Sequence, residues 1–124
     1  MAQAPRYVEH GPRTSKIVSA SYGTCFYSIG DKPGTLSAIW RSADMPEGAI
    51  GTGRAVGGPT DGSLAGNYQI SYFTSDGSLD AEFDLHIKQS GPTYAITWTI
   101  GDNVVCEGTG IDVAGGIVLA YMAP

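Results

Sequence analysis

The chain has 124 residues, of which 42% are hydrophobic, and a formal net charge of −5 at pH 7. This length suits one domain with a sizeable core, and no apolar run approaches the ~18 residues of a membrane-spanning helix. The seven Lys and Arg residues are scattered, whereas a nucleic-acid-binding protein carries a basic patch. We therefore expect a soluble globular protein with neither nucleic acid nor membrane as a partner.

Eighteen scattered glycines are typical of many short strands joined by tight turns. In chain order we predict a tail over residues 1–14, with a candidate edge strand at 6–9, followed by nine strands. These strands are residues 17–22, 24–29, 35–41, 48–56, 67–73, 81–89, 93–100, 104–111 and 117–122. No segment keeps a 3.6-residue period over three turns without Gly or Pro, so no helix is predicted.

Two parts of the chain are similar to each other. The matching residues are Phe26 and Phe83, Trp40 and Trp98, and Gly53 and Gly110, at offsets of 57, 58 and 57 residues. Such spacing indicates an internal duplication, over about 15–58 and 66–116. Each half has about four strands, and a sheet with one apolar face must bury that face against another sheet or helix. We therefore expect residues 1–124 to form a single domain.

Short strands that each follow the last after a tight turn predict an antiparallel meander. A meander must protect its edges, and closure into a barrel removes them. The predicted fold is therefore all-β, an antiparallel up-and-down β-barrel of about 8–9 strands built from two sequence-related halves. A β-sandwich is the alternative.

Period-two alternation assigns the side chains of residues 67–100 to two faces. The apolar and aromatic face, which we expect inside the barrel, carries Tyr68, Ile70, Tyr72, Phe83, Leu85, Ile87, Tyr94, Ile96, Trp98 and Ile100. The opposite face carries polar residues such as Glu82, Asp84, His86 and Lys88. A homodimer through exposed, Thr-rich strands is one assembly that such a polar face allows.

The orientation of strands 48–56 and 104–111 is ambiguous. One face of these strands carries Ala49, Gly51, Gly53 and Ala55, and then Val104, Cys106, Gly108 and Gly110. The other face would bring Glu107 and Arg54 inside, where a carboxylate without a partner is costly. We expect the glycines inside, with Trp40 and Trp98 lying across them, because large residues opposite small ones fill a narrow barrel.

Residues 93–121 contain Tyr94-Ala-Ile-Thr-Trp98, Gly108-Thr-Gly110 and Leu119-Ala-Tyr121. This pattern resembles small, largely uncharacterised bacterial proteins with a Tyr-x-Val-x-Trp strand, a Gly-x-Gly strand and a final Leu-Ala strand. The resemblance implies a small β-barrel and no activity. More distantly, the meander is similar in design to the avidin and lipocalin class, whose barrels hold small ligands, although their ligand-site signatures are absent.

The interior aromatic residues are the strongest candidates for a binding site. Tyr68, Tyr72 and Tyr94 would carry hydroxyl groups into an apolar interior beside Trp40 and Trp98. Buried tyrosine hydroxyls need partners, either backbone groups at the barrel ends or a bound ligand. The favoured function is binding of a small, mostly apolar molecule, with these five residues as the ligand-binding set.

No catalytic, metal or cofactor motif stands out. His86 is interpreted as a surface histidine, and His10, beside Glu9 and Arg13, as part of a polar tail or of a lid over a barrel mouth. The two histidines lack zinc-ligand spacing, and there is no Gly-x-Ser-x-Gly elbow. We therefore predict no catalytic residue, metal or cofactor. Two alternatives stay open: a barrel enzyme of isomerase or cyclase type acting on a small hydrophobic substrate, and a structural or interaction protein with a solid barrel core.

The two cysteines, Cys25 and Cys106, are expected to be buried free thiols that pack as small apolar residues. The first residues lack a basic start followed by an apolar core, so no signal peptide is predicted. We therefore expect a cytoplasmic protein, or an exported one from which a signal peptide has been removed.

Overall fold

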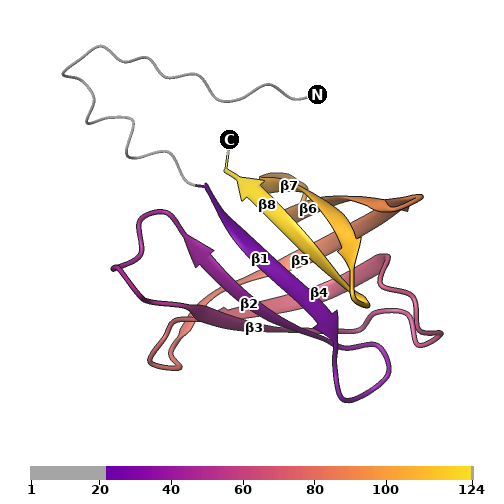
Figure 1. The fold of residues 1–124 in the computed structure, drawn as a ribbon, viewed down its shortest axis with the longest axis horizontal. Coiled ribbons are helices and arrows are strands. Elements are labelled where there is room, and N and C mark those ends of the chain that lie inside the picture. Colours follow the sequence, from indigo (N-terminus) through magenta and orange to yellow (C-terminus); the bar gives the residue numbers. More distant parts are fainter. Residues whose placement is uncertain (1–21, 124) are drawn as a thin grey trace, which may run out of the picture.

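The computed structural model describes residues 22–123, which form one closed barrel of antiparallel strands in up-and-down order (Figure 1). The strands are β1 (Tyr22–Ile29), β2 (Leu36–Ser42), β3 (Gly51–Val56), β4 (Gly66–Phe73), β5 (Leu79–Ser90), β6 (Thr93–Ile100), β7 (Asn103–Val113) and β8 (Gly116–Met122). β1 pairs with both β2 and β8, which closes the barrel. The predicted all-β, up-and-down barrel is thus confirmed, with eight strands.

The predicted strand boundaries differ from the observed ones mainly at the start of the barrel. A single strand, β1, covers the region in which we predicted a break at Gly23. The predicted edge strand at 6–9, the His10 segment and residues 17–21 lie outside the described residues. The remaining predicted strands correspond to β2 through β8.

Two hairpins show how local sequence sets the strand order. Two-residue loops join β5 to β6 and β6 to β7, and their first residues are Gly91 and Gly101, with φ values of 59° and 62°. Glycine takes this left-handed conformation without steric strain. Primed turns of this kind match the right-handed twist of the paired strands, so they direct each strand back along its neighbour.

The connections between strands alternate between the two ends of the barrel. One end carries the β1–β2, β3–β4, β5–β6 and β7–β8 connections, and we call it the closed end. The other end carries the β2–β3, β4–β5 and β6–β7 connections, together with the start of β1 and the end of β8. We call it the open end.

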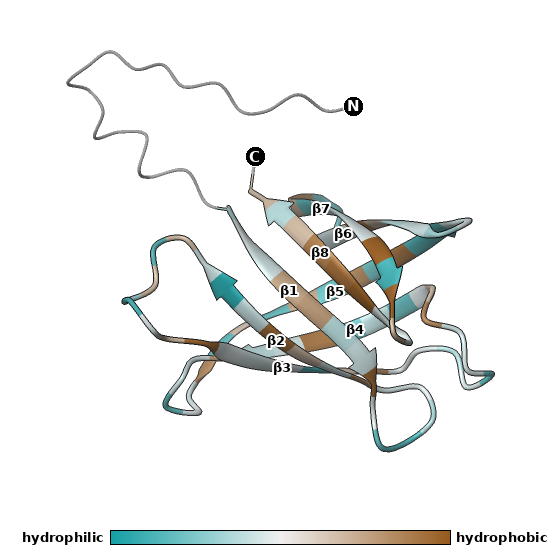
Figure 2. Cartoon of the chain, viewed as in Figure 1, coloured by the Kyte–Doolittle hydropathy of each residue, from teal (hydrophilic) through white to brown (hydrophobic). Residues whose placement is uncertain are grey.

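The predicted inward face is correct for nearly all of its members. Figure 2 shows hydrophobic and hydrophilic residues alternating along the strands. The largest fully buried side chains are Tyr27, Leu36, Ile70, Leu85, Ile96 and Ile117. Ile100, which we predicted inside, is 55% exposed. It is the last residue of β6, directly before the turn to β7. The pairing of β6 with β7 shifts by one residue just after Trp98.

The glycines of β3 and β7 face the interior, as predicted. Gly51 pairs with Trp40, and a Cβ atom on Gly51 would overlap the indole ring. Arg54 and Glu107 are exposed on the outer face. One prediction was wrong: Val104 is exposed, and Val105 packs against the core instead. The register shift makes Val105 the extra residue of β7, which reverses the alternation there.

The two halves of the barrel do not have the same register. Trp40 pairs with Gly51, whereas Trp98 pairs with Cys106. Phe26 lies on the outer side of β1, between two buried residues, while its proposed counterpart Phe83 packs inside against Tyr72. The internal duplication therefore stays a prediction that rests on the sequence.

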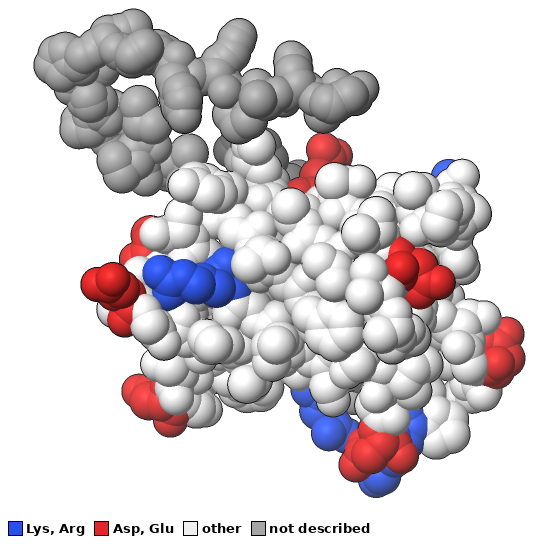
Figure 3. Space-filling model, viewed as in Figure 1, with Lys and Arg blue, Asp and Glu red and all other residues white. Residues whose placement is uncertain are grey.

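The outer surface has two different faces. On β4 and β5, Gln69 and Ser71 hydrogen-bond Asp84 and Glu82 at 3.1 and 3.0 Å. On the β7–β8–β1–β2 side, a row of successive register partners is apolar: Ile111, Val118, Phe26 and Ile39. Figure 3 shows few charges in the middle of the face formed by β8, β1 and β2. The expected homodimer stays a prediction.

Candidate functional site

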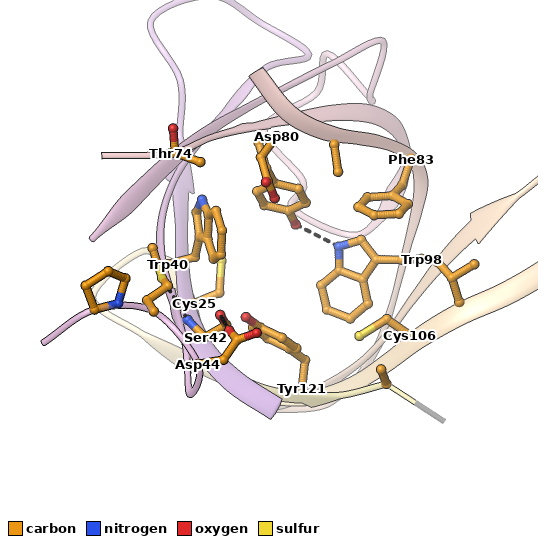
Figure 4. Close-up of a pocket in the computed structure, with 16 residues that line it drawn as sticks. Cys25, Trp40, Ser42, Asp44, Thr74, Asp80, Phe83, Trp98, Cys106 and Tyr121 are labelled. Atoms are coloured by element: carbon orange, nitrogen blue, oxygen red, sulfur yellow. Dashed lines mark hydrogen bonds between the residues drawn. The ribbon is translucent and has the colours of Figure 1, made fainter. Parts of the chain in front are cut away.

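A cavity of about 500 Å³ occupies the open end of the barrel. Its lining residues are Cys25, Trp40, Ser42, Asp44, Met45, Pro46, Tyr72, Thr74, Asp80, Ala81, Phe83, Trp98, Val105, Cys106, Tyr121 and Ala123. Figure 4 shows Trp40 and Trp98 on opposite walls, with Tyr121 between them. A volume of this size lies within the range of pockets that hold small organic ligands.

The structure divides the five predicted ligand-binding residues into two groups. Trp40, Tyr72 and Trp98 line the cavity. Tyr68 and Tyr94 are buried near the closed end, where the Tyr68 hydroxyl donates to the backbone oxygen of Leu64 at 2.9 Å. Tyr68 thus satisfies its hydroxyl with backbone at a barrel end, which was one of the two partners expected for it. Neither Tyr68 nor Tyr94 is among the lining residues.

A chain of buried hydrogen bonds supports the floor of the cavity. The indole Nε1 of Trp98 donates to the Tyr72 hydroxyl at 2.7 Å, the bond drawn in Figure 4. The Tyr72 and Tyr27 hydroxyl oxygens are 2.5 Å apart and share a further hydrogen bond. Buried polar groups are costly when unpaired, so this chain stabilises the Trp98 and Tyr72 side chains in one arrangement.

Aromatic pairs extend this arrangement around the wall. The ring centroids of Trp40 and Tyr72 are 5.6 Å apart in an edge-on geometry, and those of Tyr72 and Phe83 are 6.0 Å apart. Trp98 and Tyr121 form a third pair, at 5.9 Å. The Trp40 Nε1 donates to the Thr52 backbone oxygen at 2.8 Å. Since both indole N–H groups are bonded within the protein, the wall presents ring surfaces to a ligand.

The segment between β2 and β3 forms one side of the cavity mouth and is held by side-chain hydrogen bonds. The Arg41 guanidinium donates from Nη1 to the backbone oxygens of Pro46 and Ala49, at 2.9 and 2.8 Å. The Ser42 hydroxyl donates to the Asp44 carboxylate at 2.5 Å. These bonds place Asp44 and Pro46 at the rim, where both line the cavity.

Burial raises the pKa of four groups that line the cavity. Desolvation raises the pKa of the Cys25 thiol and of the Tyr121 hydroxyl to about 12 each. It also raises the pKa of Cys106 and, strongly, that of Tyr72. All four groups are therefore neutral near pH 7, so they present uncharged hydrogen-bonding and apolar surfaces. Both cysteines are free thiols, Cys25 buried and Cys106 half-buried.

His86 lies on the outer surface, as predicted. Its Nδ1 is 2.8 Å from the Asn67 side-chain oxygen, and its Nε2 is 3.3 Å from the Thr99 hydroxyl. The neighbouring strands therefore provide partners for both ring nitrogens, which accounts for this histidine without a catalytic role.

Sequence reasoning missed most of the cavity rim. Asp44 and Pro46 lie in a connection whose path the strand pattern does not specify. Asp80 and Val105 line the cavity because the register shifts by one residue beside each of them. The one available signal was the pair of turns that precede β5 and β7. Bulges are common at barrel rims, so the strand ends beside these turns were candidate positions for a register shift.

Within residues 22–123, no group of three or more His, Cys, Asp or Glu side chains is arranged to hold a metal ion. The same part of the chain contains no helix long and apolar enough to cross a membrane. Comparison with known protein families, with curated proteins and with solved structures finds no match to this chain.

Proposed function

We propose that the protein binds a small, mostly apolar molecule in the cavity at the open end of the barrel. The observation that carries this proposal is the cavity itself, about 500 Å³ in volume, with Trp40, Tyr72 and Trp98 in its walls. Ligand pockets are typically apolar and aromatic, with a few polar groups that orient the ligand. Here the orienting groups are the Ser42 and Tyr121 hydroxyls and the rim carboxylates.

The walls are ordered before any ligand arrives. The Trp98–Tyr72–Tyr27 hydrogen bonds and the edge-on Trp40–Tyr72 contact fix the large side chains. A preformed pocket spares a ligand the free-energy cost of ordering these side chains on binding. This arrangement favours a binding site over an incidental gap in the packing.

Binding is favoured over acid–base catalysis in the same cavity. A general base or acid works best with a pKa near the operating pH. The pKa values of the interior Cys25, Tyr72, Cys106 and Tyr121 are all raised, away from neutrality, by burial. These neutral groups suit recognition of a ligand better than transfer of its protons.

Tryptophan fluorescence gives the first test, because Trp40 and Trp98 are the only tryptophans in the sequence and both line the cavity. Titration with a panel of small aromatic and aliphatic compounds should produce a saturable change in emission. Isothermal titration calorimetry of the compounds that respond should give one site per chain.

A cavity-filling variant locates the site. Ala81→Phe places a ring on a residue that lines the cavity, so it should abolish binding while the barrel stays folded. Ala120→Phe is the matched control, because Ala120 is exposed on β8. If no compound binds the wild-type protein, or if Ala81→Phe binds as the wild type does, the proposal is wrong.

A further inference from the structure

We propose that the ligand is an organic cation, with an apolar body against the aromatic walls and a positively charged ammonium group at the mouth between Asp44 and Asp80. This inference rests on the proposed function and names the class of ligand. It follows from three observations: the sign of the charged side chains that line the cavity, the register shift that brings Asp80 to the cavity, and the aromatic residues in the walls.

The charged side chains of the cavity are all of one sign. Of the sixteen described residues that line it, two are carboxylates, Asp44 and Asp80, and none is Lys, Arg or His. Asp44 belongs to the β2–β3 connection and Asp80 to the start of β5, so the carboxylates come from different parts of the rim (Figure 4). An anionic ligand would be repelled there, whereas a cation would be attracted.

Asp80 lines the cavity because of an irregularity in β5. Tyr72 pairs with Ala81, but Phe73 pairs with Leu79, so Asp80 is an extra residue on its strand. Regular alternation would place Leu79 on the side of Ala81 and turn Asp80 outward. The observed register does the opposite, and Leu79 is left 57% exposed. Burial of apolar surface does not explain this register, because the register exposes Leu79. Bulges are known to redirect a side chain toward a functional site, and here the redirected side chain is that of Asp80.

Asp44 is held in place by its own segment. The Ser42 hydroxyl donates to one carboxylate oxygen, and Arg41 fastens the segment through the backbone oxygens of Met45, Pro46 and Ala49. The guanidinium donors are thus directed to carbonyl oxygens of the connection. The Asp44 carboxylate still has acceptor capacity for a ligand, because an ionised carboxylate accepts several hydrogen bonds.

The aromatic walls favour a cation over a neutral molecule of the same shape. The negative face of an aromatic ring attracts an ammonium group within about 6 Å, and tryptophan is the strongest such partner. Trp40, Tyr72, Trp98 and Tyr121 all line the cavity. A ligand with its charge at the mouth would therefore have both carboxylates and aromatic rings in the lining of the same cavity.

The test compares three probes of nearly equal shape: benzyltrimethylammonium, its neutral carbon analogue neopentylbenzene, and the anion phenylmethanesulfonate. Dissociation constants are measured by tryptophan fluorescence and calorimetry on the wild type, on Asp44→Asn and on Asp80→Asn. Asp84→Asn is the matched control, since it removes the same charge from the outer surface, where Gln69 is its partner.

We expect the cation to bind most tightly and the sulfonate most weakly. Each of the Asp44→Asn and Asp80→Asn changes should weaken binding of the cation by about two- to fivefold, as for other partly exposed charge pairs. Binding of the neutral probe should not change, and Asp84→Asn should change neither. Added salt should weaken binding of the cation alone.

The outcomes separate this inference from the proposed function. If the neutral probe binds and the Asn variants weaken cation and neutral probe equally, or weaken neither, the ligand class is wrong and the binding site stands. If no probe and no member of the wider panel binds, both proposals are wrong. Circular dichroism and thermal melts of each variant confirm that the comparison is made on folded protein.

Discussion

The two ends of the barrel use the same kinds of residues for different purposes. Toward the closed end, Tyr68 and Tyr94 are packed within the interior, and Ile96 and Leu85 are almost completely buried. At the open end, Trp40, Tyr72 and Trp98 surround a cavity. Large aromatic side chains are present at both ends, so their presence alone does not make the difference. It comes from how tightly the neighbouring strands and connections fill the space between the rings.

The largest expected difference between the two regions is in stability. Ile96→Ala removes a side chain that is 1% exposed and should lower the free energy of unfolding by about 3 kcal/mol, through lost burial and a new cavity. Val105→Ala, at the half-buried cavity wall, should cost about 1 kcal/mol or less, because space already exists beside it. Urea denaturation with unchanged m-values measures both. Equal losses would mean that the open end is packed as tightly as the interior below it.

The next effect concerns the tyrosine hydroxyls. Tyr72→Phe removes the acceptor of the Trp98 N–H and the partner of the Tyr27 hydroxyl, and should cost about 1–3 kcal/mol, because buried groups lose their partners. Tyr68→Phe breaks one bond to a backbone oxygen and should cost about 1 kcal/mol. Tryptophan emission should shift in the first variant only. A shift in the second, or identical stability losses, would show that the chain of bonds is not specific to the cavity floor.

The sequence predicted the barrel because its signals are local and repeated. Alternation along residues 67–98 and the glycines at the hairpin turns each specify a strand or a turn without knowledge of the rest of the chain. The inward position of Trp40 followed from the small residues opposite it. The division between a cavity and a packed end could not be predicted in this way, because it depends on how side chains from all eight strands fill a shared volume.

The rim was hidden from sequence reasoning for a different reason. The positions of Asp80 and Val105 both depend on one-residue register shifts, and a shift of one residue moves a side chain to the other face. Nothing in the local sequence pattern shows that the Leu79 side chain faces solvent and that the Asp80 side chain lines the cavity. A binding site built on irregular pairing is therefore the part of such a fold that alternation predicts least well.

The third prediction uses the titration of the interior. The pKa of Cys25 is about 12 in the folded protein against an ordinary value of 9.0, so the folded state holds this proton more tightly than the unfolded chain does. The contribution to stability is complete below pH 9 and is lost as the pH rises from 9 to 12. The free energy of unfolding should fall across this range by at most about 1.4 kcal/mol per pH unit for this group. Tyr121, raised from 10.0 to about 12, adds to the loss above pH 10.

Cys25→Ala separates the cavity thiol from the tyrosines in this profile. Chemical denaturation at several pH values should show a smaller decline between pH 9 and 10 in the variant than in the wild type, and a continuing decline above pH 10. Identical profiles for the two proteins would mean that the thiol does not titrate with a raised pKa in the cavity.

The smallest effect expected is a difference in thiol reactivity. The thiolate is the reactive form of cysteine, and burial raises the pKa of both thiols, to about 12 for the buried Cys25. Half-buried Cys106 should therefore react with iodoacetamide first, as mass spectrometry of the intact and digested protein would show.

Both thiols line the same cavity, so a bound probe should slow the labelling of Cys106 in proportion to the fraction of cavities that the probe occupies. Labelling of Cys25 first would contradict the deeper burial of its thiol, and labelling of Cys106 at the same rate with saturating probe would place the probe elsewhere.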